Sequence, residues 1–127
     1  RKYRDELSGQ VRLMRGMDLA TRNLRVIVRR VDFLVADGKP RPYLADLFEQ
    51  LADAVTLLSL GLEDPDRLHE AEVMLLEIIH QLDPKKFGIA DQLREASVLL
   101  LLRPLLIDLL CAAGMSEEDA RAQLPTI

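Results

Sequence analysis

The chain has 127 residues and a mass of 14.4 kDa, which fits one domain large enough to bury its own hydrophobic core. Hydrophobic residues make up 49% of it and charged residues 30%, and this mixture excludes both a disordered tail and a bundle embedded in lipid. The single cysteine, Cys111, cannot form an internal disulfide, so the composition does not point to an oxidising compartment. Because the sequence starts at Arg1 and not at a methionine, we expect it to be a piece of a longer chain.

Charge is distributed unevenly along the sequence. Residues 1–30 contain nine lysines and arginines against three acidic residues, a charge of +6, whereas residues 31–127 contain eight basic and eighteen acidic residues, a charge of −10. Such a division is typical of a nucleic-acid-binding arm, of a segment beside an anionic membrane, or of a helix that docks on acidic neighbours. A charged face that is solvated or paired within the domain explains it equally well. The pI of about 5.2 and the lack of interleaved aromatic residues argue against nucleic acid.

The first predicted helix covers residues 11–36. Apolar residues recur there at three- and four-residue spacing and form one stripe: Leu13, Met17, Ala20, Leu24, Ile27, Val31 and Leu34. The opposite face is a mostly basic ridge: Arg15, Asp18, Arg22, Arg25, Arg29 and Asp32. We expect Gly38 to end the helix in the left-handed conformation, and the two prolines of residues 39–42 to prevent its continuation.

The next two helices are predicted over residues 43–60 and 65–82. Because the connection of residues 39–42 is short, the first two helices should form an antiparallel hairpin, with acidic residues of the second beside the basic ridge of the first. Asp64 and Pro65 form a start signal for the third helix, as N-cap and first helical residue. Pro84 should follow its end, and Phe87 should pack beneath the loop of residues 85–90.

A fourth helix is predicted over residues 91–113, and a short fifth over residues 117–124 with Ser116 as its N-cap. The fourth is apolar nearly all round, which is typical of a central helix or of one covered by a partner. Pro104 should kink it or split it in two. The predicted fold is therefore all-α: a single domain built as an antiparallel bundle of four to five helices.

Residues 96–113 are the only stretch of membrane length, but Arg103 and Asp108 lie near its middle. Each such charge costs a transmembrane helix about 2.5–3.5 kcal/mol at its centre, so we predict a helix buried within the protein. Since unpaired charges in apolar surroundings are costly, both side chains should find partners on a neighbouring helix or at the edge of the bundle. The alternative is that they control contact with another subunit or domain. They are about 140° apart around the helix axis and should not pair with each other.

Candidate catalytic groups are few. Glu77 and His80 have the Glu-x-x-His spacing of di-iron bundle proteins, but the only other histidine, His69, lies on the same predicted helix about 16 Å away. We therefore expect all three to be exposed polar residues, no metal or cofactor to be bound, and the chain not to be an enzyme. Cys111, within an apolar helix, should be a buried small residue and not a nucleophile.

Three stretches together resemble a known family. They are residues 20–30 (ATRNLRVIVRR), residues 42–44 (PYL) followed by 51–55 (LADAV), and residues 102–114 (LRPLLIDLLCAAG). In that order they resemble the helical cytosolic region of actinobacterial integral membrane proteins of the fusaric acid resistance (FUSC), or aromatic acid exporter, family. The resemblance covers about residues 15–124, and its most specific element is Arg-x-x-x-x-Asp-Leu-Leu with the glycine that follows. Pro104 departs from the small polar residue expected after that arginine.

The resemblance implies a non-catalytic domain on the cytoplasmic side of the cell membrane, serving assembly or regulation of an exporter of small organic, aromatic acids. Transport itself would belong to a transmembrane part of the same chain. Residues 1–14 would be a basic juxtamembrane lead-in, and residues 15–127 the helical bundle domain. Anionic lipid would attract the membrane-proximal basic residues of the first thirty positions, which are Arg1, Lys2, Arg4, Arg12, Arg15, Arg22, Arg25 and Arg29.

The expected partners are the transmembrane part, a second copy of the chain packed through the fourth helix, and an anionic lipid surface, but not nucleic acid. Two alternatives stay open. One is a free-standing helical interaction domain that is dimeric through the fourth helix. The other is a small-molecule sensor whose bundle encloses an apolar ligand near four large side chains, namely Phe33, Phe48, Met74 and Phe87.

Overall fold

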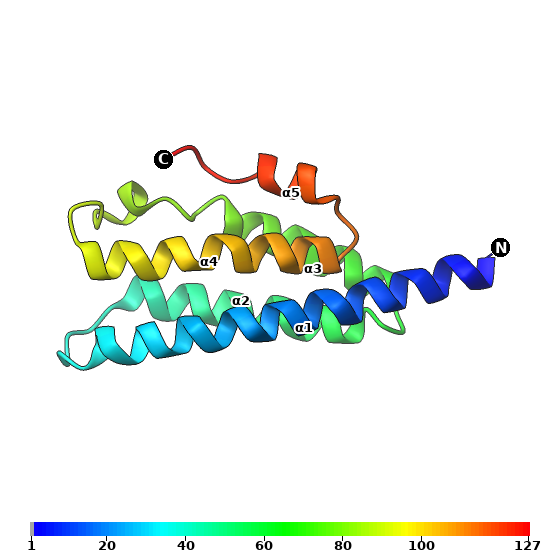
Figure 1. Ribbon diagram of the computed structural model, residues 1–127, viewed down its shortest axis with the longest axis horizontal. Coiled ribbons are helices and arrows are strands. Elements are labelled where there is room, and N and C mark those ends of the chain that lie inside the picture. Colours follow the sequence, from blue (N-terminus) through cyan, green and yellow to red (C-terminus); the bar gives the residue numbers. More distant parts are fainter. Residues whose placement is uncertain (1) are drawn as a thin grey trace.

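The computed structural model describes residues 2–127, except for the side chain of Lys2, and it confirms the all-α prediction. Five α-helices and one short 3-10 helix follow one another along the chain (Figure 1): α1 (Lys2–Val35), α2 (Pro42–Leu60), α3 (Pro65–Ile79), η1 (Pro84–Phe87), α4 (Leu93–Ala112) and α5 (Glu117–Ala122). The described part of the chain contains no strand. The four longer helices form the bundle, and α5 lies along its outside (Figure 1).

The helices pack in two close pairs, α1 with α4 and α2 with α3. The chain reverses direction between α1 and α2, as expected of a hairpin (Figure 1), but the main neighbour of α1 is α4. Besides α1, the helix α4 contacts α3, η1 and α5, so its apolar surroundings come from within the chain. This arrangement confirms that the fourth helix is central.

α1 begins at Lys2, nine residues before the predicted start, and is unbroken through residues 14 and 15, where the lead-in was expected to meet the bundle. Its N-terminal turns project beyond the ends of the other helices (Figure 1). The side chains that it buries in the bundle are spaced seven residues apart, namely Leu13, Ala20, Ile27 and Leu34. Met17 and Val31 of the predicted stripe are half-buried, whereas Leu24 is exposed.

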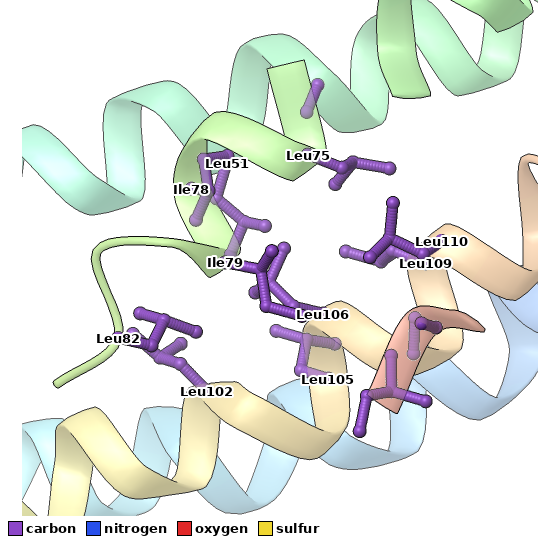
Figure 2. Packing of buried hydrophobic residues seen from close by; sticks show 14 of the residues in the cluster. Leu51, Leu75, Ile78, Ile79, Leu82, Leu102, Leu105, Leu106, Leu109 and Leu110 are labelled. Atoms are coloured by element: carbon purple, nitrogen blue, oxygen red, sulfur yellow. The ribbon is translucent and has the colours of Figure 1, made fainter. Parts of the chain in front are cut away.

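The hydrophobic core lies between α2, α3 and α4, with the buried row of α1 closing one side. Figure 2 shows leucine and isoleucine side chains of these helices pointing toward one another, including Leu51, Leu75, Ile78, Leu102 and Leu106, all of them buried.

Pro104 does not split α4, which was one of the two outcomes expected of it. Proline removes one backbone hydrogen bond of a helix and crowds the preceding turn, at a cost of about 3 kcal/mol or more. The helix remains a single element because its neighbours hold it on several sides. Pro104 itself is exposed, so its ring does not displace any core side chain.

The local end signals are confirmed. Asp64 caps α3 by accepting a hydrogen bond from the backbone N–H of Asp66 at 3.0 Å, and Ser116 caps α5 through the N–H of Asp119 at 3.1 Å. Gly38 has a φ of +72°, the left-handed conformation expected of it.

Two helices end at least two residues earlier than predicted: α5 at Ala122 instead of residue 124, and α3 at Ile79 instead of residue 82. After Ile79 the chain tightens, because Gln81 and Leu82 donate to the carbonyls three residues before them. This turn keeps Leu82 buried although it lies outside the helix.

Candidate interaction surface

The basic residues singled out in the sequence lie along α1. Arg1 and the side chain of Lys2 lie outside the described residues. The other six are exposed and extend over most of the helix: Arg4, Arg12, Arg15, Arg22, Arg25 and Arg29. Of the described ion pairs, the only one within the ridge joins Arg22 to Asp18 at 3.4 Å, and none connects the ridge to the acidic residues of α2. The hairpin pairing that we expected is therefore not formed, because α1 packs chiefly on α4.

α1 also carries most of the exposed apolar surface. Ten of the sixteen large apolar side chains that are exposed in the described part of the chain belong to this helix. Three of them, Leu19, Val26 and Phe33, are seven residues apart and have exposed fractions of 48%, 50% and 81%. Residues spaced by seven lie on one line along a helix that packs with a seven-residue period. We call this line the apolar row.

The spacing of the arginines matches that of the apolar row. Arg15, Arg22 and Arg29 are also seven residues apart, and each precedes a member of the apolar row by four residues. Side chains four residues apart are neighbours on a helix surface. We call these three residues the arginine row; it lies directly beside the apolar row on the outer side of α1.

The apolar row borders the seam between α1 and α4, where two contacts fix the helices. A Cβ added at Gly16 would lie only 2.3 Å from the Cβ of Ala112, which shows how close the two backbones approach there. Seven residues further along α1, the Asn23 side-chain amide donates to the carboxylate of Asp108 at 2.5 Å.

Two hollows open along this seam. One, of about 540 Å³, is lined by Leu19 of the apolar row together with Arg12, Arg15, Asp108 and Cys111. The other, of about 380 Å³, lies at the far end of the row. It is lined by Phe33, Leu93, Arg30, Arg94 and Ser97, with Leu34 and Val98. Both hollows combine apolar walls with arginines.

Both charged residues singled out in α4 have partners. Arg103 donates to the backbone carbonyl of Leu82 at 2.9 Å, in the turn after α3. Asp108 accepts from Asn23, and partial burial raises its pKa, helped by the negative charge of Glu117. Each therefore joins α4 to a neighbouring element.

Cys111 is half-buried and lines the larger hollow. Partial burial raises the pKa of its thiol, and the carboxylates of Glu117 and Asp108 raise it further. A raised pKa favours the protonated thiol over the thiolate.

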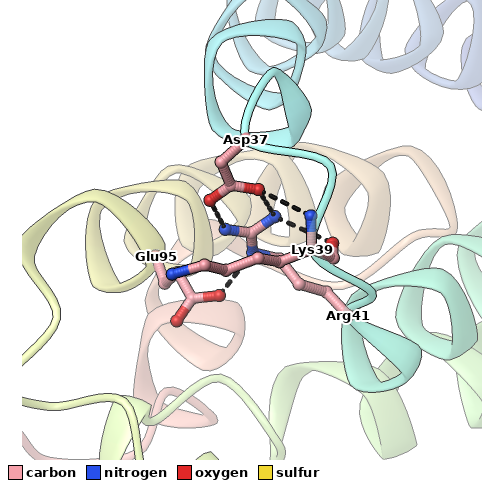
Figure 3. Close-up of polar contacts among 4 residues, drawn as sticks. All are labelled: Asp37, Lys39, Arg41 and Glu95. Carbon is pink, nitrogen blue, oxygen red and sulfur yellow. Dashed lines mark hydrogen bonds and ion pairs between the residues drawn. The ribbon is translucent and has the colours of Figure 1, made fainter.

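Sequence reasoning missed one polar cluster, at the end of the bundle where α1 joins α2 (Figure 3). The Arg41 guanidinium donates to both carboxylate oxygens of Asp37, at 3.0 and 2.6 Å, and its Nε donates to Glu95 of α4 at 2.5 Å. These contacts lower the pKa of Asp37 to about 2, chiefly through the hydrogen bond from Arg41. Asp37 and Arg41 are four residues apart, a spacing that hinted at this pair, but they lie outside the helices, where such spacing carries little weight.

Beside this cluster, Tyr43 stacks on Phe87 with ring centroids 5.2 Å apart. Its hydroxyl is buried without a hydrogen-bond partner, and burial together with the nearby Glu95 carboxylate raises its pKa to about 12. The stacking keeps Phe87 against the bundle, as predicted.

The three potential metal ligands singled out in the sequence lie on the surface. His69, Glu77 and His80 are exposed, and the His80 ring is within hydrogen-bond distance (2.9 Å) of the Gln123 side chain. No cluster of three or more potential metal ligands exists within residues 2–127.

The four side chains expected to enclose a ligand do not share a cavity. Phe33 is exposed on α1, and Phe48 lines a different hollow, an apolar groove of about 320 Å³ between α1 and α2. Met74 and Phe87 pack against the core. The groove is floored by Leu105 and Leu109 of α4.

Comparisons with known protein families, with curated proteins and with solved structures give no match for this chain. None of the described helices combines the length and apolar character needed to cross a lipid bilayer. The surface of α1, with its exposed apolar residues and arginines, is the feature on which a function can be argued.

Proposed function

We propose that the chain is a non-catalytic interaction domain, which serves assembly or regulation on the cytoplasmic side of an integral membrane protein related to organic acid exporters. The observation that carries this proposal is the composition of α1. Within the described residues, this helix carries most of the exposed large apolar side chains and also the six exposed arginines named above. Its N-terminal turns project beyond the bundle (Figure 1). A helix used only for packing against α4 would not need an apolar outer side.

The projecting turns fit a segment close to a membrane. Arg4 is exposed in the first turns of α1, between the exposed Tyr3 and Leu7, and the exposed Val11 and Arg12 follow beside the end of α4. Basic residues near the cytoplasmic surface gain about 1 kcal/mol each from anionic lipid, and tyrosine is favoured at the boundary of the bilayer. The resemblance to the exporter family supplies the rest of the proposal, namely the transmembrane part and the organic acid substrate.

Fractionation of cells that contain the native protein tests this proposal. An antibody against this chain should detect a product larger than 14.4 kDa that stays in the membrane pellet after carbonate extraction and is released by detergent. Protease should degrade the epitope only when the cytoplasmic face is accessible. Release by carbonate alone would contradict the membrane part of the proposal.

The groove between α1 and α2 favours a second candidate function, the sensing of a small apolar molecule. Its walls carry Met17, Leu24, Phe48 and Val55, and its volume of about 320 Å³ is at the lower end of the range of ligand pockets. A ligand should raise the melting temperature of the chain. Ala52→Leu, which adds bulk to the groove, should abolish that rise, and an unchanged rise in this variant would contradict the assignment.

A further inference from the structure

We infer that the outer side of α1 docks an acidic amphipathic helix of another protein, along the apolar row of Leu19, Val26 and Phe33. This inference rests on the proposed function, since it names the class of partner that the interaction domain would bind. It follows from the spacing of the row, from the charges beside it and from the shape of its far end.

The spacing favours a helical partner. The buried row of α1, from Leu13 to Leu34, and the exposed apolar row have the same seven-residue period. A period of seven keeps a row facing a neighbouring helix along its whole length, because it is the repeat of helices that pack side by side. From Leu19 to Phe33 the row extends about 21 Å, so three heptads of a partner helix would cover it.

The narrowness of the row points the same way. One neighbouring line of α1 is the arginine row, and the other contains Gly16, Asn23 and Arg30 beside α4. An apolar line bordered on one side by arginines matches the seam between two helices, in which flanking charges select the partner. A helix that lies in a lipid surface instead presents a broad apolar face to the acyl chains.

The charges favour an acidic partner and disfavour a second copy of α1. The apolar row and its two neighbouring lines contain no acidic residue between positions 12 and 33, and they contain five arginines: Arg12, Arg15, Arg22, Arg29 and Arg30. Placing α1 against another α1 through this side would bring arginines against arginines, which is destabilising. Glutamates on a partner would instead form charge-assisted hydrogen bonds with the guanidinium groups.

The end of the apolar row at Phe33 has room for one large apolar side chain of a partner. Phe33 of α1 and Leu93 of α4 are both 81% exposed and line the same hollow of about 380 Å³. Arg30 and Arg94 lie at that hollow as well. An apolar residue with an acidic neighbour on the partner helix would fit this combination.

A synthetic peptide provides the test. The probe is a labelled three-heptad peptide with leucine at positions a and d and glutamate at e and g, and its binding to the intact chain is followed by fluorescence anisotropy at physiological salt. We expect a Kd on the order of tens of micromolar, and binding at least about tenfold weaker for the same peptide with lysine at e and g. Equal binding of the two peptides, or no saturable binding of either, would overturn the inference.

Two variants locate the binding. Val26→Asp should weaken binding of the glutamate peptide at least about tenfold, whereas the control Val73→Asp, at an equally exposed valine on α3 (46% against 50%), should leave it unchanged. Replacing all three residues of the arginine row with glutamate should reverse the preference between the peptides. Circular dichroism of each variant checks that the fold persists.

Two other outcomes would assign the row differently and overturn the inference. If Val26→Asp abolishes dimerisation in analytical ultracentrifugation, the row binds a second copy. If it abolishes flotation with vesicles that contain anionic lipid while the peptide does not bind, the row contacts lipid. Neither outcome affects the carbonate-extraction result, which tests the proposed function separately.

Discussion

The close approach of α1 and α4 at Gly16 leads to a specific prediction for Gly16→Ala. An alanine there would place its Cβ 2.3 Å from the Cβ of Ala112, 2.8 Å from the Cα and 3.2 Å from the backbone nitrogen of that residue. Two of these contacts involve backbone atoms of α4, which cannot rotate away as a flexible side chain could. α1 and α4 must therefore separate locally, and the neighbouring buried residues Leu13 and Ala20 lose packing.

The magnitude follows from two opposing terms. Overpacking a well-packed site costs about 1–3 kcal/mol, whereas alanine in place of glycine within a helix gains about 0.5–1 kcal/mol. We expect the cost of overpacking to exceed the gain in helix propensity, so that Gly16→Ala lowers the free energy of unfolding by about 1–2 kcal/mol. In a domain of this size this corresponds to a fall in Tm of about 4–8 °C. Urea unfolding followed by circular dichroism measures the change in the free energy of unfolding.

Gly9→Ala is the matched control. Gly9 lies in the same helix, and an added Cβ would meet only the end of the Arg12 side chain, at 4.0 Å. This substitution should raise the free energy of unfolding by about 0.5–1 kcal/mol. Adding Ala112→Gly to Gly16→Ala should recover part of the lost stability, because it removes the nearer of the clashing atoms. If Gly16→Ala stabilises the chain as much as Gly9→Ala does, the close packing of α1 on α4 is refuted.

Three further substitutions test the core and the titrating groups. Leu106→Ala, at a fully buried position in the centre of α4, should lower the free energy of unfolding by about 2–5 kcal/mol in urea titrations; a loss under 1 kcal/mol would contradict its place in the core. Asp108 has a raised pKa, so it binds its proton more tightly in the folded state than in the unfolded state. Its contribution to the free energy of unfolding therefore falls as the pH rises above the ordinary aspartate range. Asp108→Asn should therefore remove that fall, which thermal unfolding at pH 3 to 7 would detect, and an unchanged pH profile would argue against it. Asp37 is the opposite case: its pKa of about 2 means that its pairing with Arg41 stabilises the fold above pH 4 and is lost as the pH falls toward 2. The stability difference between the wild type and Asp37→Asn should vanish over that range, and a difference that persists at pH 2 would contradict the pairing.

The features that could be predicted from the sequence are those determined by nearby residues. Asp64, Ser116 and Gly38 signal helix ends through their own backbone and side-chain chemistry, and each is found in its predicted role. The apolar period likewise predicted that Leu13 and Ile27 would be buried. Such signals do not depend on where the rest of the chain lies.

The neighbours of each helix could not be predicted in the same way. The stripe of α1 indicates a buried face but not the helix that covers it, and the short connection suggested α2 where the structure has α4. Gly16 lies beside the stripe, and a glycine within a helix signals a close approach of two backbones without indicating which helix approaches. The bond from Arg41 to Glu95 spans 54 residues, and no local pattern indicates it.

Only one part of the candidate surface could be predicted from the sequence. The ridge with Arg15, Arg22 and Arg29 follows from the helical period and is exposed as expected. The apolar row beside it is not among the predictions, which place Phe33 at an enclosed ligand site, although the spacing of seven between Val26 and Phe33 is present in the sequence.

The buried row and the apolar row of α1 separate what folding requires of this helix from what it leaves unexplained. The buried row suffices to attach α1 to α4, and the Gly16 contact fixes the distance between them. The exposed row lies largely outside that contact, since about half or more of each of its residues faces solvent. Single exposed apolar residues are common on protein surfaces, but three at a constant spacing of seven, each preceded by an arginine four residues earlier, form an ordered pattern. We propose that this order serves a second elongated element lying along α1, and the arginines favour an element that carries negative charge.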